Sequence, residues 1–145
     1  MHAEAEPYRS DEEVLEVVRR FETCEFAPDD FKHRQHLVVA LYHLLRGPER
    51  DAQARVREGI LKFLAHHRID PASVYHETLT VFWVRRVAAF VRRAGRGRTL
   101  AALANELAGS CGSSRLVFDY YSKALIESDE ARRAWAAPDL KPLDF

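Results

Sequence analysis

Apolar side chains recur every three or four residues through most of this chain, and this spacing predicts amphipathic helices. One such stripe holds Leu37, Ala40 and Leu41, and the Gly47-Pro48 pair that follows is a strong signal for the end of a helix. The same spacing predicts five main helices: about four turns after Ser10, then residues 31–46, 50–67, 73–95 and 99–109. No Asn-Gly or Asp-Gly hairpin signal interrupts the pattern.

Residues able to cap a helix stand at the predicted helix starts, where a side-chain oxygen can accept a free backbone N–H. The predicted caps are Ser10 with Glu13, the turn at residues 28–30, Ser73, Thr99, Ser122 and Ser128. The last two would begin two short helices, the second of which ends near Trp135. Residues 116–121 are rich in β-branched and aromatic side chains and fit either an extended segment or the start of a helix.

These elements predict an all-α protein, a helical bundle of four to five main helices with short C-terminal helices. At 145 residues, the chain is most simply one domain over residues 1–145. Residues 1–9 are expected to form a flexible N-terminus, and residues 136–145 an extended C-terminal tail.

Basic and acidic residues balance, with 22 of each, and this balance argues against a nucleic-acid partner. Cys24 and Cys111 form no CxxC pair and indicate a reducing compartment. The N-terminus has no apolar core of a signal peptide, and no apolar run approaches the roughly 18 residues of a transmembrane helix. We therefore expect a soluble cytoplasmic protein without a membrane partner; the oligomeric state stays open.

His33 and His36 are the strongest candidates for chemistry. Helix positions three apart lie on one face, about 5–6 Å apart at Cβ, so two imidazoles can converge on one metal ion. His76, at the start of another predicted helix, would supply the third ligand and leave a coordination position open. His43 lies ten residues from His33, about 15 Å along the helix, and is therefore no equal candidate. Three imidazoles suit zinc, copper, nickel or iron, and the sequence does not choose among these divalent transition metals.

Glu77 follows His76 and is the candidate catalytic residue, as the general base for a metal-bound water. It can instead orient a histidine ligand, or only complement the positive end of a helix. Six arginines between Arg85 and Arg98 form a run without acidic residues. The run can bind an anionic ligand, although a solvated helix face is the simpler interpretation.

Several segments together resemble a known family. They are residues 31–37, 75–83, 120–122, 131–135 and 138–140, and they span most of the chain. The chain is similar in them to a family of small uncharacterised bacterial helical proteins with [WF]-x-H-x-x-H-L and Y-H-E-T-x-T motifs. This resemblance implies that His33, His36, His76 and Glu77 belong together, and it implies no reaction.

The sequence thus predicts a metal-binding protein with a three-histidine site and a neighbouring glutamate. If the protein is an enzyme, we expect a metalloenzyme that acts on a small molecule. The alternative is a non-catalytic helical module in which the same histidines and Glu77 form a buried polar network that fixes helix packing.

Overall fold

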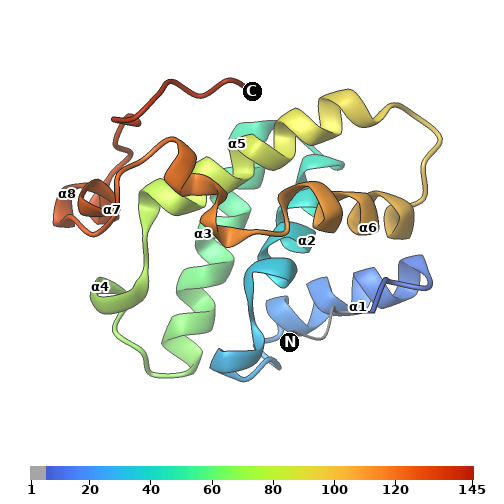
Figure 1. Ribbon diagram of the computed structural model, residues 1–145. Helices are drawn as coiled ribbons and strands as arrows, with labels where there is room; N and C mark the ends of the chain where they lie inside the picture. Colours follow the sequence, from blue (N-terminus) through green and yellow to red (C-terminus); the bar gives the residue numbers. More distant parts are fainter. Residues whose placement is uncertain (1–5) are drawn as a thin grey trace.

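The computed structural model describes residues 6–145, which fold into helices and connecting segments without any strand (Figure 1). The five long helices are α1 (Asp11–Glu22), α2 (His33–Leu44), α3 (Glu49–His66), α5 (Glu77–Ala94) and α6 (Leu100–Cys111). The short elements are the 3-10 helices η1 (Pro28–Asp30) and η2 (Ser114–Asp119), and the helices α4 (Pro71–Val74), α7 (Lys123–Ile126) and α8 (Asp129–Arg133). The prediction of an all-α helical bundle is confirmed.

Four of the predicted caps are in place. The side chains of Ser10, Thr99, Ser122 and Ser128 each accept a backbone N–H from the first turn of the helix that follows. Each of these bonds joins residues three apart in the chain, for example Glu13 N to Ser10 Oγ at 3.3 Å. Such local bonds satisfy donors that the helix itself leaves free.

Other predicted helix boundaries were wrong. Ser73 lies inside the short helix α4, which begins at Pro71 behind an Asp70 cap, and α5 starts only after an extended Tyr75. The turn at residues 28–30 forms η1, and the N-cap of α2 is Lys32. Helix α6 continues through the predicted stop at Gly109 to Cys111. For residues 116–121 the sequence left an extended segment and a helix start open, and residues 116–119 lie in the 3-10 helix η2.

Helix α2 lies at the centre of the bundle and packs against α1, α3, α5 and α6. Five consecutive residues of α2, 37 to 41, are buried, so this helix has no solvent face over that stretch. Phe21 of α1 and Phe63 of α3 pack into the same apolar cluster. We refer to α1, α2, α3, α5 and α6 together as the helical core.

Residues 114–145, called the C-terminal segment from here on, form a second apolar cluster against α5. Phe82 of α5 is fully buried there with Val117, Tyr120, Tyr121 and Ile126. Figure 1 shows α7 and α8 beside the start of α5, and the last residues returning over the top of the molecule in that view. The predicted tail at 136–145 is bonded to the residue that follows η2, since Leu140 N donates to Tyr120 O at 2.9 Å.

The N-terminal segment predicted to be flexible falls partly outside the described residues, since these begin at residue 6. Within them, Tyr8 is joined to α6 by two bonds with Asn105, at 2.8 and 2.9 Å. Cys24 and Cys111 are buried and unbridged. None of the helices described here is long and apolar enough to cross a bilayer.

Candidate functional site

The motif at the start of α5 divides between two neighbours. Tyr75 and Glu77 are hydrogen-bonded to each other and, through Glu77, to α3, whereas His76 and Thr78 are bonded to the C-terminal segment. Residues next to each other at a helix start point in different directions, about 100° apart. The motif therefore forms a polar seam, made of Tyr75, His76, Glu77 and Thr78, between α5 and the elements on either side.

Glu77 is held by a bidentate ion pair with Arg57 of α3. Arg57 Nε donates to one carboxylate oxygen at 2.9 Å and Arg57 Nη2 to the other at 2.7 Å, while Tyr75 Oη donates at 2.5 Å. Desolvation would raise the pKa of Glu77, but the bonds from Arg57 and Tyr75 lower it on balance. Burial and the bond to Glu77 raise the pKa of Tyr75 to about 12.

His76 uses both ring nitrogens inside the protein. Nδ1 accepts the Leu79 N–H at 3.1 Å, which makes His76 the N-cap of α5. Because Nδ1 is an acceptor, Nε2 carries the proton and donates it to Ile126 O of α7 at 2.7 Å. Burial lowers the pKa of His76, so the ring is neutral at pH 7.

Thr78 makes the second bridge to the C-terminal segment. Its hydroxyl donates to Ala134 O at 3.0 Å and accepts from Ala136 N, also at 3.0 Å. The side chain is fully buried, so both bonds are sheltered from water. One hydroxyl thus fixes the chain on both sides of Trp135.

His33 lies between α6 and α5. Its Nε2 donates to Cys111 O at 2.8 Å, and its ring packs against that of Trp83 at 4.4 Å between centroids. Burial lowers the pKa of His33, although the bond to the carbonyl opposes the shift. His76 precedes Trp83 by seven residues, about 10 Å along the axis of α5.

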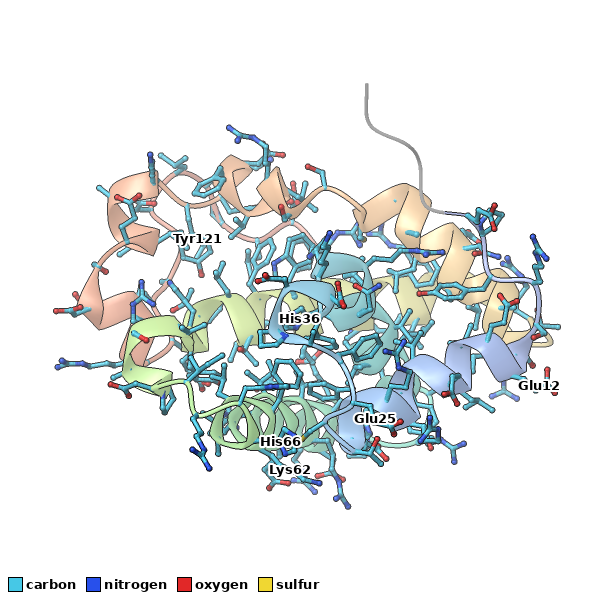
Figure 2. All side chains as sticks on the ribbon, turned by 90° about the horizontal axis from the view of Figure 1, so that it is seen from below. Glu12, Glu25, His36, Lys62, His66 and Tyr121 are labelled. Atoms are coloured by element: carbon cyan, nitrogen blue, oxygen red, sulfur yellow. The ribbon has the colours of Figure 1, made fainter. Side chains whose placement is uncertain are left out.

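His36 lies near the middle of the molecule (Figure 2). Its ring packs 4.2 Å from that of Phe31. Burial, with a smaller contribution from nearby His33, lowers the pKa of His36 to about 4. His36 is therefore neutral at pH 7, and the helical core holds it in that form.

The structure brings His33 and His36 together but directs His76 and Glu77 to other partners. In residues 6–145, no group of three histidine, cysteine or carboxylate side chains is arranged to hold a metal ion. His76 has no free lone pair, because one nitrogen is protonated and the other accepts a backbone N–H. The residues in this arrangement do not fit a three-histidine centre, and the metal site stays a prediction.

The other histidines between residues 6 and 145 have separate surroundings. His43 lies 4.0 Å from the carboxylate of Glu22, and His67 Nε2 donates to Phe26 O at 2.9 Å. Exposed His66 projects from α3 at the edge of the molecule in Figure 2.

Sequence reasoning missed Arg57, the partner of Glu77. Arg57 stands 20 residues before Glu77 in a helix with many other charges, so no local pattern marks it. The run from Arg85 to Arg98 also divides in the structure. Arg85 and Arg86 lie over the rings of Trp135 and Phe145, while Arg92, Arg96 and Arg98 line a groove at the other end of α5.

Comparison with known proteins gives no relative. No family model matches the chain, and no curated protein or solved structure matches it either.

Proposed function

We propose that this chain is a non-catalytic helical module in which the polar seam locks the C-terminal segment and α3 onto α5. The observation that carries this proposal is the bonding of His76, whose two ring nitrogens both serve backbone groups. A histidine committed in this way caps a helix and bridges two elements. In this proposal the bridge is its role.

The surroundings of Glu77 support the same role. A general base works best when its pKa lies near the working pH and its oxygen can reach the reacting proton. The pKa of Glu77 is lowered, and both of its oxygens already accept bonds from Arg57. Glu77 therefore joins α5 to α3 as a fixed ion pair.

Metal binding is the second candidate function, and one observation favours it. His33 and His36 are adjacent, and both are neutral at pH 7 because burial lowers their pKa values. A neutral imidazole keeps one basic nitrogen, which is the form that binds a transition metal. In this second proposal, the His76 side chain would leave its two backbone partners and become the third metal ligand beside His33 and His36.

Two variants of His76 separate capping from bridging. Asparagine is a good N-cap but is too short to reach Ile126, whereas alanine removes both functions. We expect His76→Ala to lower the free energy of unfolding by about 2–4 kcal/mol, from the lost cap and the orphaned carbonyl. His76→Asn should lose less, about 1–3 kcal/mol, but should still expose the C-terminal segment to limited proteolysis.

Metal content measured on the tag-free protein distinguishes the two candidates. The structural role predicts no stoichiometric zinc, copper, nickel or iron in the native protein, and no metal-dependent rise in melting temperature. Stoichiometric metal that disappears in each of His33→Ala, His36→Ala and His76→Ala, but persists in the matched control His43→Ala, would overturn it in favour of the metal site.

A further inference from the structure

A basic groove lies where the ends of α2 and α5 meet the start of α6. It is a cavity of about 850 Å³, within the usual range for small-molecule sites. Four arginines line it, and we call it the arginine groove; they are Arg46, Arg92, Arg96 and Arg98. Its remaining walls are mostly apolar, from Tyr42, Leu45, Val91, Leu100 and Leu103.

The positive charge of this groove is only partly neutralised. Arg98 pairs with Glu106 at 2.5 Å, and Arg92 lies 3.8 Å from Glu49. Neither glutamate lines the groove. For Arg46 and Arg96, no ion pair occurs within residues 6–145. A groove lined by four arginines and by no acidic residue attracts anions.

Local structure places three of these arginines along the groove. The guanidinium of Arg46 lies over the ring of Tyr42, 4.3 Å from its centroid. Gly95 and Gly97 both have φ of 77°, a left-handed conformation that glycine adopts without strain. The two turns place Arg96 and Arg98 in the short connection between α5 and α6, so both line the groove.

The start of α6 is already capped by the protein. Thr99 Oγ1 accepts the Ala102 N–H at 3.1 Å, and an Asp11 carboxylate oxygen accepts the Ala101 N–H at 2.9 Å. The binding strength of the groove for an anion therefore rests on its arginine side chains.

A second cavity, of about 480 Å³ between α1 and α2, provides a contrast. Three glutamates line it with Arg20 and Arg34, so its charge is mixed. The arginine groove is both larger and uniformly basic.

We propose that the arginine groove binds a small phosphorylated organic molecule of about mononucleotide size. Each guanidinium presents two parallel N–H donors that match the oxygens of a phosphate or a carboxylate. A single arginine is enough to bind a carboxylate through both oxygens. Four arginines along one groove therefore favour the multiply charged phosphate. The apolar walls fit an organic body beside the phosphate, and the balanced overall charge disfavours a long nucleic acid.

Calorimetric titration with AMP tests this inference, with adenosine as the uncharged control ligand. The buffer contains a chelator, so the result does not depend on whether the histidines bind a metal. We expect one AMP per chain and binding of adenosine at least about tenfold weaker. Equal affinities for AMP and adenosine would contradict the proposal. Binding of neither AMP nor inorganic phosphate at millimolar concentration would also contradict it.

Arg46→Ala and Arg96→Gln remove guanidinium groups that make no ion pair with the part of the chain that the structure describes, and thermal melting verifies that each variant is folded. Each should weaken AMP binding by about tenfold or more. The matched control is Arg93→Ala, an exposed arginine at the same end of α5 that does not line the groove. An equal loss of AMP affinity in the control would mean general charge attraction and would overturn the proposal. Tighter binding of a 20-base-pair duplex through the same arginines would indicate a nucleic-acid site and would also overturn it.

Discussion

The helical core and the C-terminal segment are built in different ways. The core consists of helices of 12 to 18 residues that bury apolar faces against one another. The two α-helices of the C-terminal segment have only four and five residues, a length at which an isolated helix is not stable in water. Its position therefore depends on bonds and packing with α5 and within itself.

Side-chain bonds to backbone atoms supply much of this anchoring. His76 and Thr78 bond α5 to backbone groups of Ile126, Ala134 and Ala136. Within the segment, Tyr121 Oη donates to Ala136 O at 2.6 Å. The comparison shows how a segment with little regular structure can acquire a fixed path: buried side chains of a neighbouring helix supply partners for its backbone.

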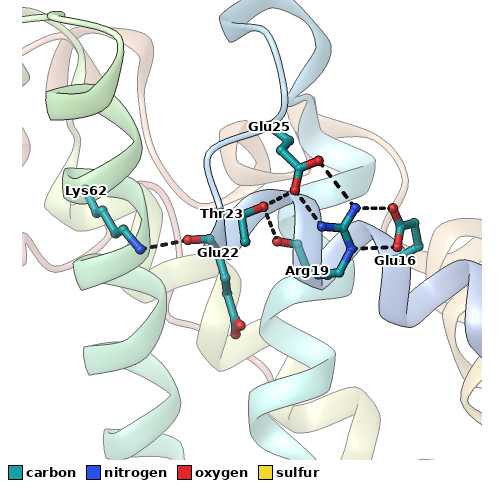
Figure 3. Close-up of polar contacts among 6 residues, drawn as sticks. All are labelled: Glu16, Arg19, Glu22, Thr23, Glu25 and Lys62. Atoms are coloured by element: carbon teal, nitrogen blue, oxygen red, sulfur yellow. Dashed lines mark hydrogen bonds and ion pairs between the residues drawn. The ribbon is translucent and has the colours of Figure 1, made fainter.

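Ion pairs differ between the seam and the outer surface in a similar way. Figure 3 shows an exposed network at the end of α1, where Arg19 contacts Glu16 and Glu25, and Lys62 of α3 donates to the Glu22 carbonyl. Such exposed pairs are screened by water and contribute little to stability. The Arg57–Glu77 pair is less exposed and adds a phenol donor, so its geometry is more restricted.

Phe82→Ala should break the connection between the two regions most strongly. Phe82 is fully buried and its ring contacts those of Tyr120, Tyr121 and Phe145. Removing a buried phenyl ring leaves a cavity, and we expect the free energy of unfolding to fall by about 3–5 kcal/mol. Urea denaturation measures the loss, and limited proteolysis should cleave the C-terminal segment first.

The matched control is Phe118→Ala, in the same segment but 37% exposed. It should change stability by about 0.5 kcal/mol or less. A similar loss in both variants, or proteolysis of both regions at one rate, would mean that the segment has no separate stability.

Acid should weaken the helical core through His36. Its pKa is about 4 in the folded protein against 6.5 for the unperturbed group, so between these values the unfolded chain binds the additional proton. The stability that neutral His36 contributes is complete above about pH 6.5 and is lost as the pH falls towards 4; the full change is about 3 kcal/mol. His36→Leu removes this titration and places an apolar side chain in the same position.

Denaturant unfolding of wild type and His36→Leu at several pH values between 4 and 7 measures this effect. The two stability curves should diverge over that window, with the variant less sensitive to acid. His66→Leu, at an exposed histidine, is the control and should follow the wild type. Parallel curves for His36→Leu and wild type would refute the assignment of this acid sensitivity to His36.

Features set by neighbours in sequence were predictable, and those set by distant contacts were not. Ser122 and Ser128 each accept the backbone N–H of the residue three positions ahead, so the acceptor and the donor of each cap lie within four consecutive residues. His76 caps α5 by the same spacing, but histidine is an uncommon cap, and its second partner, Ile126, is 50 residues away. The grouping of His33, His36 and His76 needed a tertiary contact that helix spacing alone does not specify.

The smallest expected effect comes from one substitution made twice, in the C-terminal segment and in the chain that packs beside the helical core. Tyr121 Oη donates to a backbone carbonyl, whereas Tyr8 Oη is buried without a hydrogen-bond partner in the described part of the chain. Tyr121→Phe leaves the Ala136 carbonyl without its donor and should cost about 1–3 kcal/mol. Tyr8→Phe removes a buried hydroxyl that makes no hydrogen bond to any of residues 6–145, so it should be neutral or slightly stabilising.

Thermal and urea unfolding of both tyrosine variants, measured side by side, test this difference, because the atoms removed are the same. The expected order is Tyr8→Phe equal to or above wild type, and Tyr121→Phe below it. Equal losses would show that Tyr8 Oη has a partner in solution, such as a bound water. No loss for Tyr121→Phe would mean that apolar packing of the ring, and not its bond to Ala136, holds this part of the C-terminal segment.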